Sequence, residues 1–214
     1  MEKKHLAELD VTEFVFQLSS RKPTPGGGGA SALAGALGIA LGGMVANLTI
    51  GKPNYANADD EMKKLKVSAY RVQKELLELI QKDADGFDPL AGAYRMPSGT
   101  DEEKAEKARV MEAALKDAAE NPLAIMERCA EALELLEALA LRGNRLAVSD
   151  AGCGAALCRA AMQSAWLNVA VNTVAMRDAE YAARLNDRGS ALLGEYLPRA
   201  EKLYCSIEEG FRRT

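Results

Sequence analysis

The stretch Pro23-Thr24-Pro25-Gly26-Gly27-Gly28-Gly29-Ala30-Ser31 leads directly into a run without charged residues that continues to Gly51. Proline restricts its own backbone, whereas glycine permits close approaches that a side chain would block. If a helix begins here, its first N–H groups lack partners within the helix, and its dipole favours anionic or electron-rich groups. The stretch therefore predicts either a ligand-binding loop at a helix N-terminus or a tight connection between packed helices.

The uncharged run predicts a helix over residues 28–50 with two contrasting ridges. Small residues recur every fourth position on one ridge (Ala30, Ala34, Gly38, Gly42, Ala46), and large ones form the other (Leu33, Leu37, Leu41, Met44, Leu48). Glycine within a helix costs up to ~1 kcal/mol relative to alanine, so close packing or ligand access has to offset that cost. The run is also long enough to span a bilayer. Its polar Asn47 and Thr49, and the missing aromatic belts, favour a helix buried within a helical domain.

The remaining sequence predicts further helices and no strand. Apolar residues from Met62 to Leu79 recur at alternating spacings of three and four, which is typical of a helix packed lengthwise on another. Residues 160–176 carry no charge and predict a second buried helix. Helix breaks are expected at residues 83–89, 95–99, 121–122 and 142–143. We therefore expect an all-α fold, a single helical domain over residues 1–214 with about seven helices and two buried central ones.

Composition excludes several classes of function. The net charge is −4 and no basic tract with interleaved aromatic residues occurs, so a nucleic-acid partner is not expected. The four cysteines form no Cys-x-x-Cys pair and His5 is the only histidine, so no metal site is expected. The cysteines are typical of buried thiols in a reducing compartment, and the amino terminus lacks an apolar signal segment. We expect a cytoplasmic protein.

With histidine essentially unavailable, acid–base chemistry falls to carboxylates, lysine or tyrosine. Asp83 is expected at a helix break and Asp150 at a helix start. Each is either an ordinary helix-end residue or a carboxylate directed into a ligand site. Lys52 and Tyr55 follow the first apolar helix and offer a cation and a phenol to a ligand. Three asparagines lie within the apolar helices, namely Asn47, Asn168 and Asn172. They either pair with each other or the backbone, or line a polar pocket.

Several motifs occur together and in order along nearly the whole chain. They are Pro-Thr-Pro-Gly-Gly-Gly (23–28), Ser-Ala-Leu-Ala-Gly-Ala-Leu-Gly (31–38), residues 44–49, Gly51-Lys52 with Tyr55, Asp-Ala-Asp-Gly-Phe (83–87), Ala-Tyr-Arg-Met-Pro (93–97), Ser-Asp-Ala-Gly (149–152) and residues 167–172. This set closely resembles the cyclodeaminase/cyclohydrolase family of folate enzymes. One departure is Gly29, where the family commonly has serine. The loop thus lacks that hydroxyl, and Ser31 is the nearest remaining one.

The resemblance implies an all-helical, commonly dimeric protein with a tetrahydrofolate site near the glycine loop and no tightly bound cofactor. Two reactions are implied. One is hydrolysis of 5,10-methenyltetrahydrofolate to 10-formyltetrahydrofolate. The other is cyclising deamination of 5-formiminotetrahydrofolate, which releases ammonia. Because no formiminotransferase domain is fused to the sequence, we expect the hydrolase and keep the deaminase as the alternative.

On this interpretation Asp83 is the first candidate for the catalytic base, Asp150 the second, and Lys52 a proton shuttle or a partner of the folate glutamate. The expected substrate-binding residues are Pro25, Gly26, Gly27, Gly28, Ser31, Asn47, Tyr55, Asn168 and Asn172. A non-catalytic helical binding protein remains an alternative from another class. It predicts that these polar residues lie far apart.

Overall fold

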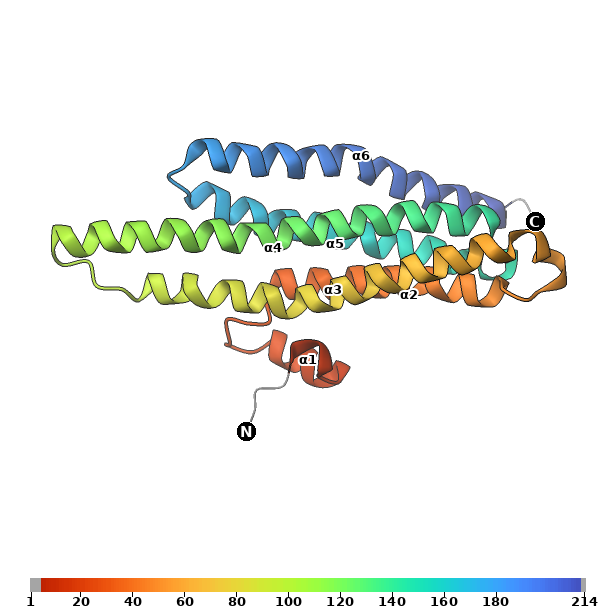
Figure 1. Cartoon of the computed structure of the whole chain (residues 1–214), viewed down its shortest axis with the longest axis horizontal. Helices are drawn as coiled ribbons and strands as arrows, with labels where there is room; N and C mark the ends of the chain where they lie inside the picture. The colour runs from red at the N-terminus through yellow and green to blue at the C-terminus, as the bar shows by residue number, and fades with distance from the viewer. Residues whose placement is uncertain (1–4, 213–214) are drawn as a thin grey trace.

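In the computed structural model, which describes residues 5–212, the chain folds into helices and turns (Figure 1). The α-helices are α1 (Val11–Leu18), α2 (Gly27–Thr49), α3 (Asp59–Tyr94), α4 (Asp101–Arg142), α5 (Val148–Ala175) and α6 (Ala179–Arg212). Three short 3-10 helices are η1 (Leu6–Glu8), η2 (Pro53–Ala58) and η3 (Arg145–Ala147). The all-α prediction is confirmed for the described residues, with six α-helices where about seven were expected.

The five long helices lie side by side in an elongated bundle, and the short α1 lies to one side of it (Figure 1), with its Phe14 buried in the core. Helix α2 packs against α3, α4 and α5, while α5 also packs against α4 and α6. The expected seam on α3 faces this core, where Met62, Val72 and Leu76 are fully buried. The predicted packing of central helices is therefore correct.

The two central helices cross where both have glycine. A Cβ on Gly38 would lie 2.9 Å from the Gly154 carbonyl oxygen and 2.6 Å from the Cys158 sulfur. A Cβ on Gly154 would lie 2.6 Å from the Gly38 carbonyl oxygen. The small ridge thus brings the α2 and α5 backbones into contact, which offsets the cost of helical glycine.

Two predicted helix breaks do not occur. Helix α3 continues through Gly86 and Pro89, and α4 continues through Asn121 and Pro122. Proline within a helix removes the N–H that would bond the carbonyl four residues earlier. At Pro122 this frees the Ala118 carbonyl, to which Asn172 of α5 donates from Nδ2 at 3.1 Å. A tertiary hydrogen bond therefore replaces the missing helical one.

The large ridge of α2 is not fully covered. Leu37 and Met44 are 53% and 47% exposed, and on α5 Leu167 and Val171 are 68% and 66% exposed. Each central helix therefore buries one side and leaves an uncharged stripe on the surface. Within residues 5–212, α2 alone is long and apolar enough to cross a bilayer, with 56% of its most apolar window buried. The core helices of water-soluble proteins meet the same criterion, so this is weak evidence for a membrane span.

Candidate functional site

The glycine loop forms the N-terminus of α2. Gly26 occupies the N-cap position, where serine, threonine, aspartate or asparagine would normally cap the helix with a side chain. Pro25, preceded by a cis peptide bond, is buried beside this turn. The first N–H groups of α2 therefore need partners from elsewhere in the chain or from a ligand.

Asp83 of α3 supplies one such partner. Its Oδ2 accepts a hydrogen bond from the Gly29 N–H at 2.9 Å, so a side chain from another helix caps α2. The approach is close, because a Cβ on Gly28 would lie 2.0 Å from Asp83 Oδ1. Only glycine at position 28 leaves room for this carboxylate. Among the described residues, Oδ1 has no hydrogen-bond partner and remains available as an acceptor.

The position of Asp83 makes it more basic than an ordinary aspartate. Burial raises the pKa of the Asp83 carboxyl above its usual value, and the Gly29 hydrogen bond opposes this only in part. A carboxylate with a raised pKa is a better proton acceptor at a given pH than a solvated one. A free carboxylate oxygen and a raised pKa are two properties that a general base needs.

Asn168 of α5 completes the surroundings of the loop. A Cβ on Gly27 would lie 3.0 Å from Asn168 Nδ2 and 3.1 Å from its Oδ1, so glycine is also needed there. Asn168 Nδ2 donates to the Ser164 carbonyl at 2.9 Å. The site thus joins a carboxylate, an amide and the first N–H groups of α2, which lack partners within the helix.

Two other predicted binding residues have structural hydrogen bonds. Ser31 is only 2% exposed and its hydroxyl donates to the Gly27 carbonyl at 2.7 Å, so it braces the first turn of α2. Asn172 Nδ2 donates to the carbonyls of Asn168 and Ala118. The backbone-pairing interpretation of the buried asparagines therefore holds for Asn172.

The remaining predicted site residues lie at the opposite end of the bundle. Helix α2 rises about 1.5 Å per residue, so Asn47 is about 30 Å from the glycine loop, and Lys52 and Tyr55 follow it. Asp150 begins α5, which runs antiparallel to α2. The Tyr55 hydroxyl accepts a hydrogen bond from the Arg145 N–H at 3.0 Å, joining η2 to η3. Within one chain the polar residues therefore form two groups, as the non-catalytic alternative partly predicted.

Sequence reasoning missed two residues that position Asp83. Asn121 lies at one of the predicted helix breaks, but its Nδ2 donates at 3.1 Å to the carbonyl of Lys82, the residue before Asp83. A Cβ on Gly86 would lie 2.6 Å from this Nδ2, so Gly86 is a packing residue within α3. A glycine and an asparagine far apart in sequence give no local signal of this contact.

The described residues contain no cluster of three histidine, cysteine, aspartate or glutamate side chains placed to hold a metal ion. All four cysteines are free. Cys129 and Cys158 are buried in the core, and burial raises the pKa of the Cys158 thiol to about 12. These two thiols are packing residues and poor nucleophiles.

The model of the formiminotransferase-cyclodeaminase family matches residues 10–191, a range that includes the glycine loop, Asp83 and Asn168. The chain belongs to this family. The resemblance inferred from the motifs is therefore confirmed.

Relatives in the family differ in length and in name. A methenyltetrahydrofolate cyclohydrolase of Methylorubrum extorquens is 38% identical over 198 residues, which cover 92% of this chain and 95% of the relative. A formimidoyltransferase-cyclodeaminase of Sus scrofa is 31% identical over 95% of this chain, but the match covers only 38% of that longer protein. A formiminotetrahydrofolate cyclodeaminase of Thermotoga maritima has a crystal structure that matches with a TM-score of 0.79 and 29% identity, covering 94% of this chain and 98% of that one. Relatives named for each of the two candidate activities thus match nearly the whole of this chain.

Proposed function

We propose that this protein hydrolyses 5,10-methenyltetrahydrofolate to 10-formyltetrahydrofolate. The observation that carries the proposal is the match, over nearly the full length of both chains, to a relative named methenyltetrahydrofolate cyclohydrolase. The partly buried Asp83, held against the glycine loop, provides the base that this reaction needs. The protein is thus an enzyme of folate metabolism.

In the proposed mechanism the methenyl carbon, bonded to N5 and N10 in a cationic group, is the electrophile. Asp83 removes a proton from water as the water oxygen bonds to this carbon. The proton is then delivered to N5 while the C–N5 bond breaks, and the second water proton leaves to solvent as the formyl C=O forms on N10. The negative carboxylate also stabilises the cationic substrate through its charge.

The glycine loop supports this chemistry through its backbone. The N–H groups at the start of α2 favour an oxygen that gains negative charge, as the attacking oxygen does once it is deprotonated. Asn168 offers an amide to the pterin. The scheme uses no tightly bound cofactor. We also propose a cytoplasmic location, which is consistent with the four free cysteines.

Cyclodeamination of 5-formiminotetrahydrofolate is the second candidate, supported by the cyclodeaminase relatives and by the fold match to one of them. In that reaction N10 attacks the formimino carbon and its proton passes to the formimino nitrogen. Protonated Asp83 then donates a second proton to this nitrogen, which departs as ammonia and leaves the methenyl cation. The same residues serve both reactions, so a direct assay is needed.

The test supplies each folate separately to the purified protein and compares kcat/KM. Loss of methenyl absorbance above the uncatalysed rate supports hydrolysis, whereas ammonia release from the formimino substrate at a higher kcat/KM assigns deamination instead. For hydrolysis, kcat/KM should rise with pH as Asp83 loses its proton, with a midpoint above the ordinary aspartate pKa of about 3.9. Turnover of neither folate would contradict both proposals.

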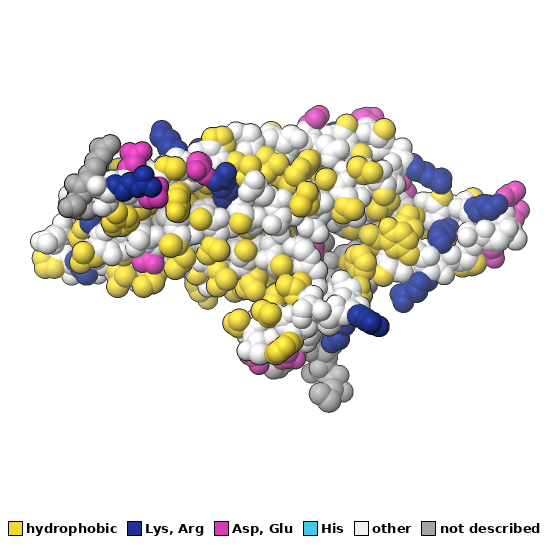
Figure 2. All heavy atoms as spheres, turned by 180° about the vertical axis from the view of Figure 1, so that it is seen from behind, with side chains coloured by type: hydrophobic (Ala, Val, Ile, Leu, Met, Phe, Trp, Pro, Cys, Tyr) yellow, Lys and Arg dark blue, Asp and Glu magenta, His cyan; other side chains and the backbone are white. Residues whose placement is uncertain are grey.

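We propose further that the active form is a homodimer joined through the exposed sides of α2 and α5. This α2–α5 face is defined by Leu37, Met44, Leu48, Leu167, Val171 and Val174, all more than a third exposed. Figure 2 shows hydrophobic side chains spread over the middle of the molecule from this side, with charged groups mostly toward its ends. Exposed apolar surface of this extent is typical of an interaction site.

The dimensions of the face match a dimer interface. Helix α2 is about 35 Å long, and two adjacent helices are about 20 Å wide, which gives ~700 Å² per copy. A typical stable interface buries about 800 Å² on each partner. Pairing about a two-fold axis perpendicular to α2 also places the far end of one copy beside the glycine loop of the other. A role for Lys52 or Asn47 at the folate then requires the second copy.

Leu37→Glu is expected to convert the dimer into a monomer. In a two-fold dimer both copies carry the substitution, so two unpaired carboxylates would be buried in one apolar interface. Light scattering coupled to gel filtration measures the mass. Tyr204→Glu is the matched control, since Tyr204 is 42% exposed on α6, away from this face. A monomeric wild-type protein, or a Leu37→Glu variant that remains dimeric, would contradict this interface.

A further inference from the structure

Helix α1 exposes most of its apolar surface. Phe14 is its one buried side chain, whereas Val11, Val15, Phe16 and Leu18 are 78%, 54%, 71% and 36% exposed. Successive residues of an α-helix are about 100° apart, so these four side chains lie within one half of its surface. Figure 2 shows α1 as the projection at the lower edge of the molecule, with hydrophobic side chains on it. Such a surface is typical of a contact with a partner.

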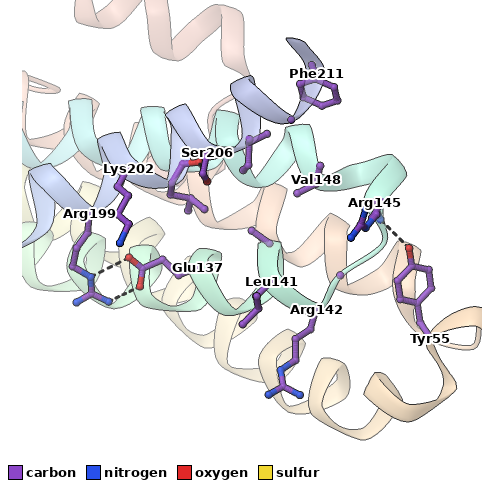
Figure 3. A pocket seen from close by; sticks show the side chains of 15 residues that line it. Tyr55, Glu137, Leu141, Arg142, Arg145, Val148, Arg199, Lys202, Ser206 and Phe211 are labelled. Carbon is purple, nitrogen blue, oxygen red and sulfur yellow. Dashed lines mark hydrogen bonds and ion pairs between the residues drawn. The ribbon is translucent and has the colours of Figure 1, made fainter. Parts of the chain in front are cut away.

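A groove between α2 and α3 has room for one of these side chains. Its volume is about 330 Å³, and a Cβ on Gly43 would meet nothing within 4 Å, so the groove is open over this glycine. Met44 and Tyr70, which are 47% and 68% exposed, form its apolar walls. This α2–α3 groove is defined by Gly43, Met44, Asn47 and Leu48 of α2 and by Lys66 and Tyr70 of α3. The bundle ends beyond it, where the Arg145 N–H bonds the Tyr55 hydroxyl (Figure 3).

The groove continues the α2–α5 face. Met44 and Leu48 belong to both surfaces, so a second copy seated on that face also covers the groove. The occupant of the groove in such a dimer is therefore a segment of this same chain.

Two-fold symmetry brings α1 of one copy to the groove of the other. The Leu6 N–H donates to Gln81 Oε1 at 2.9 Å, and Ile80 lies against Gly29. The segment that leads into α1 therefore flanks the N-terminal half of α2 on its α3 side, whereas the groove flanks the C-terminal half on that side. An axis perpendicular to α2 and in the plane of the interface exchanges these halves and keeps both α3 helices on one side. It thus places each α1 at the groove of the other copy.

The charges on the two surfaces are complementary. Within residues 5–212, Glu13 of α1 has no cation within ion-pair distance, and Lys66 of the groove has no carboxylate. Glu13 lies one turn before Phe16, on the neighbouring part of the helix surface. When Phe16 enters the groove, Glu13 can therefore reach Lys66 of the other copy.

The contact also supplies area to the dimer. The α2–α5 face gives ~700 Å² per copy, whereas a typical stable interface buries about 800 Å² on each partner. Helix α1 is about 12 Å long and about 10 Å wide, so it adds ~120 Å² per copy, and the groove adds a similar area. Together these surfaces reach the size of a stable interface.

We propose that α1 of each copy packs into the α2–α3 groove of the other copy. Phe16 lies over Gly43, between Met44 and Tyr70, and Glu13 pairs with Lys66. The proposal rests on the proposed dimer and not on which folate the enzyme converts. The dimer and this contact are therefore measured separately.

Two single-cysteine variants test the contact by cross-linking. Phe16→Cys and Tyr70→Cys are made separately in a chain whose exposed Cys153 and half-buried Cys205 are replaced by serine. After subunit exchange in a mixture, a short bismaleimide should give a covalent dimer on a denaturing gel. Each variant alone should give none. Phe16→Cys mixed with Tyr204→Cys is the matched control and should also give none, since Tyr204 is on α6, away from this face.

Sedimentation velocity measures the dimer itself, and thermal melting checks that each variant is folded. Phe16→Glu should raise the dimer Kd at least about tenfold, whereas Tyr204→Glu should not change it. Lys66→Glu should raise the Kd about threefold, and Glu13→Lys/Lys66→Glu should restore it. A dimeric protein without the cross-link between positions 16 and 70 overturns the contact but leaves the dimer standing, whereas a monomeric wild type overturns both. A charge swap that restores nothing overturns the ion pair.

Discussion

Asp83→Asn is expected to lower kcat for methenyltetrahydrofolate hydrolysis by about 10²–10⁴-fold, the usual contribution of a general base. The fold should persist, because the asparagine amide oxygen can still accept the Gly29 hydrogen bond that Asp83 accepts at 2.9 Å. Burial raises the folded-state pKa of Asp83, so its titration adds stability only at low pH, and this gain is lost as pH rises through the folded pKa. At neutral pH the melting temperature should therefore stay equal or rise.

Asp85→Asn makes the same change of charge two residues later. Asp85 is exposed and accepts a hydrogen bond from Gln81 Nε2 at 2.7 Å, so near wild-type turnover is expected. Loss of methenyl absorbance in a stopped-flow or steady-state assay compares the variants. If folded Asp83→Asn hydrolyses the substrate undiminished, Asp83 is not the base.

The architecture was predictable because local patterns and tertiary packing agree. The alternating three and four spacing on α3 placed Met62, Val72 and Leu76 in the core, where they are buried. Helix α4 begins after the predicted break at 95–99 with a capping box, in which the Thr100 and Glu103 side chains both bond the backbone. Such signals lie within a few residues and need no knowledge of partners.

The continuation of helices through proline was not predictable, because it depends on residues that are distant in the sequence. The compensation at Pro122 comes from Asn172, whose bond to Ala118 joins residues 54 apart in sequence. Local rules correctly identify the missing helical hydrogen bond but contain no information on a distant donor. The predicted break was therefore wrong, although the proline does remove a helical hydrogen bond there.

The candidate site was predictable only in part. The scarcity of histidine indicated carboxylates, and the family resemblance made Asp83 the first of them. The structure places Asp83 against Gly28 and Gly29. The other predicted site residues lie far from the loop because of the length of α2. Asn47 shares α2 with the loop, but helical rise places it about 30 Å away. A motif read in sequence order does not show that its two ends lie at opposite ends of a bundle.

Gly28→Ala is expected to disable the enzyme almost as fully as loss of Asp83, although it adds only a methyl group. The new Cβ would lie 2.0 Å from Asp83 Oδ1 and 2.4 Å from Cγ, distances that force the carboxylate away. Displacing a catalytic group by about 1 Å costs ~10²-fold in rate, and overpacking of this kind costs about 1–3 kcal/mol. Steady-state kinetics and denaturant unfolding measure the two effects.

A double-mutant cycle shows whether this effect acts through Asp83. In an Asp83→Ala background the carboxylate is gone, so adding Gly28→Ala should cost much less stability than it does in the wild type. Gly194→Ala on α6 is the control, since its Cβ would meet nothing within 4 Å and should stabilise the helix by about 0.5–1 kcal/mol. Equal destabilisation by Gly28→Ala in both backgrounds would mean that the methyl group collides with something other than Asp83. Gly28 would then be required by the packing of the loop itself. It would no longer be the residue that makes room for the Asp83 carboxylate.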